Sequence, residues 1–246
     1  CSLEEIAGHA GPNRWFQLYF QPRREASLDL VRRAEAAGYT ALVVTLDASI
    51  QAPSLSALRA GFRMPDDVLP ANLAHYPALA QGVLPPAASR VFQGLMAAAP
   101  TVQDMAWLSR QTRLPVLAKG VLHPEDALAL RALGMAGIVV SNHGGRSLDG
   151  VPASLKVLPA VRRAVGNDFP LLLDGGIRSG ADVFKALASG ADAVMVGRLQ
   201  LYALSVAGAL GVAHLLRLLR EELEVCMALA GCPTLSAIGA DALHRP

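Results

Sequence analysis

The chain has 246 residues, of which 52% are hydrophobic and 17% are charged, and its formal net charge at pH 7 is +2. This length and balance are typical of one sizeable globular domain, and they exclude a disordered chain or a strongly basic nucleic-acid-binding protein. We therefore predict a single domain over residues 1–246 and no nucleic-acid partner.

Cysteine content and hydropathy bear on the compartment. Cys1, Cys226 and Cys232 lack the spacing of a metal site, which favours reduced structural thiols in an intracellular protein with no bound metal. The longest largely apolar run, residues 201–216, is shorter than the ~20 residues that a membrane span needs, and no signal peptide opens the chain. We expect a soluble, cytoplasmic protein, for which peripheral membrane association stays open.

Predicted strands alternate with predicted helices along the chain. A half-unit recurs, in which a helical pattern ends on glycine and an unbroken apolar run follows, as suits a left-handed helix end and a parallel strand buried on both faces. This half-unit covers residues 36–45, 133–141 and 189–197, and further strands are predicted at 15–19, 114–118 and 169–173. Apolar positions recur at helical spacing in residues 28–37, 124–133, 155–165, 181–188 and 201–229.

Such alternation predicts either a doubly wound parallel sheet or a TIM (β/α)8 barrel. We favour the barrel, because its functional residues gather at the carboxyl ends of the strands and every predicted strand here ends in a polar residue or glycine. The residues at those ends are Gln17, Tyr19, Thr45, Asp47, Lys119, Ser141, His143, Asp174, Gly197 and Arg198. Polar caps of ordinary turns explain any one of these strand ends, but they explain all six ends together less well than an active-site rim does.

Residues 141–149, Ser-Asn-His-Gly-Gly-Arg-Ser-Leu-Asp, follow the apolar run 137–140. A histidine in a free peptide has a pKa of about 6.5, so His143 is a candidate general base near neutral pH. Arg146 offers a fork of donors suited to a carboxylate. Taken alone, this segment is better explained as a solvated polar loop, because short motifs occur often by chance.

Two glycine-containing segments follow the last two predicted strands: Asp174-Gly175-Gly176-Ile177-Arg178 and Gly197-Arg198. Barrels commonly hold a phosphate at this place, with backbone amides and a helix N-terminus. Glycine lets the backbone N–H groups approach the phosphate, and arginine adds bidentate hydrogen bonds. We predict an anion site here, and a tight turn is the alternative.

Together these motifs resemble the FMN-dependent α-hydroxy acid dehydrogenase/oxidase family, which includes glycolate oxidase, lactate oxidase and dehydrogenase, and mandelate dehydrogenase. The resemblance runs through nearly the whole chain, and its His-Gly-Gly-Arg segment is highly specific. It implies FMN as cofactor and the oxidation of an L-2-hydroxy acid to the 2-keto acid. The implied electron acceptor is oxygen, a quinone or a cytochrome, and the implied assembly is a homo-oligomer such as a tetramer.

The resemblance also implies roles for the matching residues. His143 would take a proton from the substrate and Asp47 would orient and charge-stabilise it, while Arg146 would hold the substrate carboxylate and Tyr19 the substrate oxygen. The isoalloxazine contacts would be Gln17, Thr45, Lys119 and Ser141, and Asp174 would lie near the ribityl chain. The FMN phosphate would be held by Gly175, Gly176, Arg178, Gly197 and Arg198.

The chain departs from the family pattern in two places, and one long segment interrupts its own repeat of strands and helices. Only strands three to eight of the barrel are represented, so that the N-terminal part, with a flavin-cradling loop and a substrate-binding tyrosine, is expected to be missing. Residues 48–100 form that long segment, which we predict to be a loop or lid, with a packing or oligomer-contact insertion as an equal alternative. The family's second substrate-binding arginine has Ser54 in its place, with Arg59 nearby as a replacement.

Two other functions stay open. Another FMN- or phosphate-binding barrel, such as a relative of type-2 isopentenyl diphosphate isomerase, is not expected to combine His143 with Arg146. A catalytically silent truncated barrel that acts as a binding or assembly module would be consistent with six strands and with Ser54.

Overall fold

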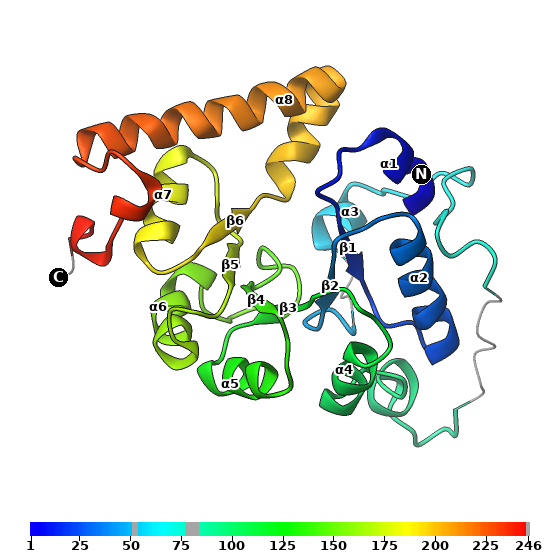
Figure 1. Cartoon of the computed structure of the whole chain (residues 1–246). Coiled ribbons are helices and arrows are strands. Elements are labelled where there is room, and N and C mark those ends of the chain that lie inside the picture. The colour runs from blue at the N-terminus through cyan, green and yellow to red at the C-terminus, as the bar shows by residue number, and fades with distance from the viewer. Residues whose placement is uncertain (51–53, 77–83, 245–246) are drawn as a thin grey trace. The chain divides into compact units, whose positions relative to one another are not determined.

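The computed structural model describes residues 1–50, 54–76 and 84–244. The described residues form six strands, which follow one another in the hydrogen-bonded order β1-β2-β3-β4-β5-β6 with helices between them (Figure 1). The pairs β1–β2, β4–β5 and β5–β6 are parallel. A doubly wound sheet would reverse its strand order at a switch point, whereas this sequential order is that of a (β/α)8 barrel. The predicted barrel class is therefore confirmed, with six of its strands present.

The strands are β1 (Trp15–Leu18), β2 (Ala41–Thr45), β3 (Val116–Val121), β4 (Gly137–Val140), β5 (Leu171–Asp174) and β6 (Ala193–Met195). The α-helices are α1 (Leu3–His9), α2 (Arg24–Ala36), α3 (Leu55–Arg59), α4 (Val102–Ser109), α5 (Pro124–Ala132), α6 (Ser154–Val165), α7 (Gly180–Ala188) and α8 (Arg198–Leu229). A π-helix, η1, spans Arg90–Leu95, and two 3₁₀ helices are η2 (Leu235–Ala237) and η3 (Ala240–Ala242).

The chain divides into two compact units. The first comprises residues 1–118 with 133–135, and the second comprises residues 119–132 with 136–246. In the first unit all five residues of β2 are buried, and α2 buries Leu30, Val31 and Ala34. α1 begins with a capping box between Ser2 and Glu5, which satisfies backbone N–H groups that the first helical turn leaves without partners.

In the second unit the core consists of β4 and the apolar residues of β5, which are buried, together with the inner face of α6. Arg162 of α6 joins the carboxyl-terminal end of that helix to the segments that precede β5 and β6. Its guanidinium donates to the carbonyl oxygens of Gly166 and Phe169, both at 2.8 Å, and of Gly190 at 2.7 Å, and it forms an ion pair with Asp192 at 2.7 Å. This one side chain therefore satisfies several loop carbonyls that would otherwise need other hydrogen-bond donors.

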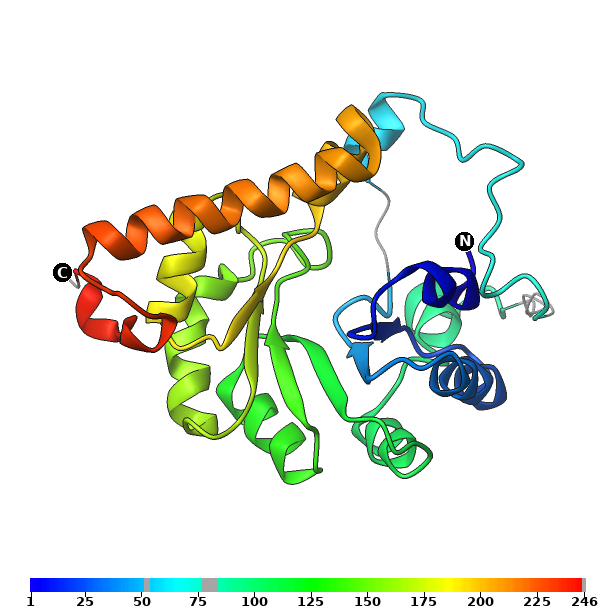
Figure 2. The same ribbon diagram turned by 45° about the horizontal axis from the view of Figure 1, so that its top comes forward.

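The last long helix, α8, is broken about one third of the way along its length. Ala207 and Gly208 have non-helical dihedrals, and Gly208 has a φ of 57°. The part after the break packs beside α7, where Leu223, Cys226 and Met227 contact the buried residues Phe184, Ala188, Cys232 and Ile238 (Figures 1 and 2). The expected helix-packing role of residues 201–229 therefore applies to the second half of α8.

By length and composition alone, α8 could cross a membrane, and it is the one such helix among the described residues. The apolar run at residues 201–216 thus belongs to a helix of 32 residues, whose bounds agree closely with the helical pattern predicted at 201–229. The break at Gly208 interrupts any straight apolar span, and the second half carries Arg217, Arg220, Glu221, Glu222 and Glu224. These two features favour a pair of surface helices over a membrane span.

Two further expectations changed in detail. We expected Lys119 just beyond the end of a strand, but β3 begins at Val116 and continues to Val121, so Lys119 is a buried residue inside the strand. The segment 48–100, expected as a loop or lid, contains the short helices α3 and η1. Its residues 51–53 and 77–83 lie outside the described residues.

The cysteines Cys1, Cys226 and Cys232 are free thiols, as expected.

Candidate functional site

The residues predicted to form the site fall into both compact units. The first unit contains Gln17, Tyr19, Thr45 and Asp47. The second unit contains Lys119, Ser141, His143, Arg146, Asp174, Gly175, Gly176, Arg178, Gly197 and Arg198.

In the first unit, the predicted residues follow from the parallel pairing of β1 with β2. Gln17 and Thr45 lie near the carboxyl ends of these strands, and the Gln17 side-chain amide donates to the Thr45 hydroxyl at 3.0 Å. Thr45 is buried, while Gln17 is exposed. Tyr19 comes directly after β1 and Asp47 two residues after β2, and both are half-buried. The structure therefore brings Gln17 and Thr45 into direct contact.

In the second unit, three predicted residues from three adjacent strands form one buried polar network. The Lys119 ammonium lies 3.2 Å from Asp174 Oδ2 and donates to Ser141 Oγ at 2.9 Å. The Ser141 hydroxyl donates to Asp174 Oδ1 at 2.6 Å and accepts the backbone N–H of His143 at 3.0 Å. A hydroxyl has one donor and two acceptor positions, so Ser141 uses its full capacity.

The burial of this network decides its strength. Lys119 is 8% exposed and Ser141 is fully buried. A buried ammonium is stable only beside a carboxylate and further hydrogen-bond partners, and Asp174 and Ser141 supply both. The network therefore holds one positive charge at a defined point near the carboxyl ends of β3, β4 and β5.

His143 has a strained backbone. Its φ is 55°, and among the described residues it is the one non-glycine residue with a positive φ. Such strain persists where surrounding contacts enforce it, and it is common at functional sites. One of these contacts comes from Arg198, whose Nη2 donates to the carbonyl oxygen of Gly144 at 3.0 Å. His143 is half-buried, and Arg146, three residues later, is exposed.

Two glycines of the predicted anion site have the expected left-handed backbone, and two have open space around them. Gly175 and Gly176 have φ values of 91° and 89°, which favour glycine. A Cβ built on Gly176 or on Gly197 meets no atom within 4 Å. Gly197 is the N-cap of α8, and no side chain caps that helix end. The first amides of α8, with Arg198 beside them, are thus suited to an anion.

The neighbouring helix α7 is different, because its own residues cap it. Ser179 and Asp182 form a capping box, and the Asp182 carboxylate also accepts the backbone N–H of Arg178 at 3.1 Å. Burial opposes ionisation of Asp182, but the hydrogen bonds from Arg178 and Ser179 and the charge of Lys185 outweigh it and lower its pKa. The predicted helix N-terminus for a phosphate is therefore that of α8, while Arg178 contributes an exposed side chain.

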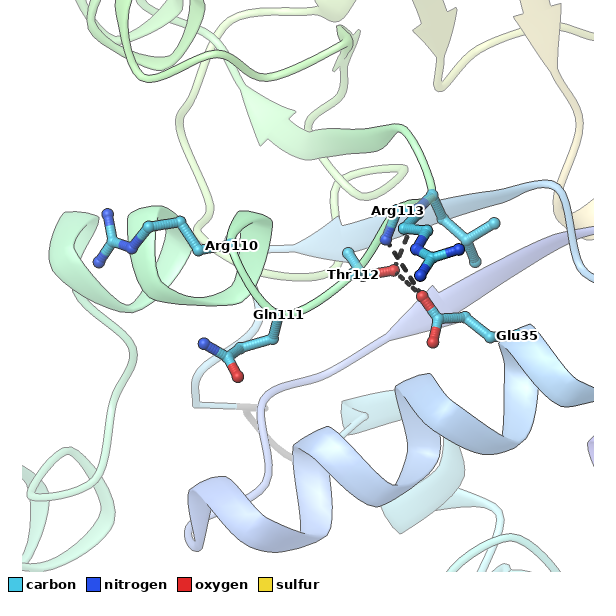
Figure 3. Close-up of a pocket in the computed structure, with 6 residues that line it drawn as sticks. Glu35, Arg110, Gln111, Thr112 and Arg113 are labelled. Carbon is cyan, nitrogen blue, oxygen red and sulfur yellow. Dashed lines mark hydrogen bonds between the residues drawn. The ribbon is translucent and has the colours of Figure 1, made fainter.

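An open cavity of about 550 Å³ in the first unit lies elsewhere (Figure 3). Its lining residues come from the end of α2 and from the turn before β3. Glu35 Oε1 accepts hydrogen bonds from the Thr112 hydroxyl and from the Arg113 backbone N–H. This is the amino-terminal end of the strands, where barrels carry stabilising residues, so we interpret the Glu35 contacts as a turn support.

Residues 1–245 match the FMN-dependent dehydrogenase family. The chain belongs to this family. It is 66% identical over 243 residues to an L-lactate oxidase of Alicycliphilus denitrificans, covering 99% of this chain and 67% of that protein. It is 50% identical to an L-lactate oxidase of Roseobacter sp., covering 98% of this chain and 65% of that protein.

Solved structures agree with these matches. A mandelate oxidase variant with (S)-mandelic acid is 43% identical, with a TM-score of 0.84 over 96% of this chain and 64% of that chain. The same variant is also known with a C4a-OH-FMN adduct, at a TM-score of 0.83. The chain therefore spans about two thirds of the length of these relatives. The predicted resemblance to the FMN-dependent family is confirmed.

Two residues that support the His143 loop were not among the predicted site residues. Asn142 Oδ1 accepts the backbone N–H of Gly144 at 3.1 Å, and the Ser154 hydroxyl accepts the backbone N–H of Asn142 at 3.0 Å. Asparagine commonly bonds the backbone two residues further on, so Asn142 could have been recognised from its place before His-Gly-Gly. Ser154 is twelve positions away from Asn142 in the sequence, and nothing local indicates their contact.

Proposed function

We propose that this chain carries catalytic and FMN-binding residues of an enzyme that oxidises an L-2-hydroxy acid, of the lactate, glycolate or mandelate kind, to the 2-keto acid. The observation that carries this proposal is the buried network of Lys119, Ser141 and Asp174, whose serine also holds the backbone of His143. It places a fixed positive charge next to the loop with the candidate base. The relatives named as 2-hydroxy acid oxidases support the same function.

The residues that follow β5 and β6 fit the phosphate of FMN. The uncapped first turn of α8, the open space around Gly176 and Gly197, and the guanidinium groups of Arg178 and Arg198 offer donors to a phosphate. The Asp174 carboxylate, which ends β5, offers an acceptor to a ribityl hydroxyl. When bound, FMN supplies the acceptor for the two electrons that leave the substrate.

Lys119 is proposed to stabilise negative charge that develops on the cofactor side of the reaction. Its ammonium is held from two directions, by the Asp174 carboxylate and by the Ser141 hydroxyl, so it is oriented before the reaction begins. A fixed charge in a buried place needs no reorganisation when charge develops, which is the condition for effective electrostatic catalysis.

His143 is proposed to take the proton from the substrate, and Arg146 to bind the substrate carboxylate. The left-handed backbone of His143, between bonds at Ser141 and Gly144, defines the direction in which its side chain leaves the loop. From the family resemblance, we assign the substrate oxygen to Tyr19, support of the base to Asp47, and flavin contacts to Gln17 and Thr45.

The remaining assignments follow from the relatives. Because they are named oxidases, we propose oxygen as the electron acceptor, with a dehydrogenase that uses a quinone or a cytochrome as the alternative. We also propose a cytoplasmic homo-oligomer, on the family resemblance alone. The isomerase-like alternative loses support, because the relatives act on 2-hydroxy acids according to their names.

The test uses protein expressed from the complete reading frame that encodes this chain. We expect visible flavin absorption that bleaches when L-lactate, glycolate or (S)-mandelate is added without air, while D-lactate leaves it unchanged. His143→Gln should keep the absorption and slow bleaching by about a hundredfold or more, as expected for loss of a general base. A colourless protein that FMN cannot reconstitute would favour the silent binding module.

A further inference from the structure

We propose that Ser154 is a positioning residue for His143, and that it acts by holding Asn142. This inference rests on the proposed function for its catalytic consequence. Its structural part concerns the conformation of residues 141–145 and can be measured separately.

The first observation is the unusual use of Ser154. It is the first residue of α6, one position after the place from which a serine commonly caps a helix, and it is 1% exposed. Here the N-cap is Ala153, which makes no side-chain hydrogen bond to the helix. The Ser154 hydroxyl instead accepts the backbone N–H of Asn142 at 3.0 Å. The helix start therefore supports the preceding loop.

The second observation is that Asn142 holds the residues on the far side of His143. Its side-chain oxygen accepts the N–H of Gly144 at 3.1 Å, and its backbone oxygen accepts the N–H of Gly145 at 2.9 Å. His143 lies inside this turn with a φ of 55°. Because a left-handed histidine is unfavourable alone, bonds on both sides of it must hold the conformation.

The third observation concerns Gly175, in the turn after β5. A Cβ on Gly175 would lie 2.8 Å from Asn142 Oδ1 and 3.2 Å from Ser154 Oγ, so this turn packs directly on the pair. Gly175 follows Asp174, which holds Ser141. The backbone of His143 is thus supported from two places: by Ser141 with Asp174, and by Ser154 with Asn142.

The experiment compares Ser154→Ala with two variants. Ser154→Thr keeps the hydroxyl. Ser27→Ala is the matched control, because Ser27 is fully buried in α2 and accepts a backbone N–H, that of Gln21, at 2.8 Å. Amide hydrogen exchange and the imidazole NMR signals of His143 are recorded for each, with thermal unfolding as a measure of global stability.

We expect the amides of Asn142 and Gly144 to exchange about five- to tenfold faster in Ser154→Ala, as for the loss of one hydrogen bond, and the His143 signals to shift or broaden. Ser154→Thr should restore both, and Ser27→Ala should change neither. Equal exchange at residues 142–145 in Ser154→Ala and Ser27→Ala would overturn the proposal, as would a threonine variant that behaves like alanine. If Ser154→Ala does not fold, Ser154→Cys, with its weaker acceptor, replaces it.

Kinetics of the complete enzyme test the catalytic consequence. We expect Ser154→Ala to lower kcat about tenfold with little change in KM or in FMN affinity, because the base is displaced while the carboxylate and phosphate contacts stay. An unchanged kcat together with a loosened loop would disprove the positioning role. An inactive wild-type enzyme would instead refute the proposed function, and the exchange data would still decide whether Ser154 holds the loop.

Discussion

Lys119 and Asp174 form an ion pair of 3.2 Å in which the two side chains are 10% and 20% exposed, so the charges are largely removed from water. Removing one partner of such a pair leaves an uncompensated buried charge, which costs about 3–5 kcal/mol. Asp174→Leu should therefore lower the free energy of unfolding by several kcal/mol. The double variant Lys119→Met with Asp174→Leu should recover most of that loss in urea denaturation. A double variant no more stable than Asp174→Leu alone would show that the pair is not coupled.

Substitution of Arg162, which lies outside the predicted site, should lower the stability of the fold strongly. It donates to several loop carbonyls and pairs with Asp192, and its side chain is 12% exposed. Hydrogen bonds to a charged group contribute about 1.5–3 kcal/mol each, so Arg162→Met should lower the unfolding free energy by about 3 kcal/mol or more. Its exposed neighbour Arg163 is the matched control, and Arg163→Met should change the unfolding free energy little. Equal effects of the two substitutions in thermal unfolding would contradict this.

How far the fold was predictable depended on whether local pattern and tertiary contact agreed. β2 and β4 were predictable because their residues are mainly apolar and follow a helix-ending glycine, Gly38 or Gly134. The extent of β3 was wrong because Lys119 reads as polar and Gly120 as a turn. The partners that make a buried lysine stable in a strand, Ser141 and Asp174, come from other strands.

The site was predictable one residue at a time. His143 and the glycine segments carry local signals, and the structure brings Lys119, Ser141 and Asp174 together as strand neighbours do. The contact of Ser154 with Asn142 and the bond from Arg198 to Gly144 depend on how distant segments meet, which no periodicity encodes. The break in α8 was missed because Gly208 lies within an Ala- and Leu-rich pattern that continues on both sides.

We expect substitution of glycine by alanine to have opposite effects on stability at Gly180 and at Gly8. A Cβ on Gly180 would lie 2.1 Å from the backbone nitrogen of Leu223, so Gly180→Ala should force α7 and α8 apart and destabilise the second unit by several kcal/mol. Gly8 lies in α1 with no atom within 4 Å of its Cβ position, so Gly8→Ala should stabilise by about 0.5–1 kcal/mol. Thermal unfolding of both variants checks the signs. If Gly180→Ala left the thermal stability unchanged, α7 and α8 would have to pack less closely than the structure shows.

The ion pair between Glu4 and Arg33 in the first unit should be sensitive to acid. A hydrogen bond from Arg33 lowers the pKa of Glu4 to about 2. A carboxylate with a lowered pKa stabilises the folded state above its unfolded pKa of about 4.5, and the stabilisation is lost as the pH falls toward 2. Because the Glu4 side chain is 47% exposed, we expect less than about 1 kcal/mol between pH 5 and pH 2.5. Glu4→Gln should remove this part of the pH dependence, and an unchanged pH profile would contradict the prediction.

We expect the substitution Ser54→Arg to raise the affinity for the substrate. Its hydroxyl caps α3 by accepting the Ala57 N–H at 3.3 Å, in a helix of exposed residues, so Ser54→Arg should lower stability by only about 1 kcal/mol. Because the family resemblance places a carboxylate-binding arginine here, we expect Ser54→Arg to lower KM for a 2-hydroxy acid severalfold and to change KM for the corresponding 2-hydroxy amide little. Ser56→Arg, two residues later on the same helix, controls for added charge. Equal KM changes for acid and amide, or for the two variants, would mean that position 54 does not face the carboxylate, and Arg59→Ala would then test whether the other candidate does.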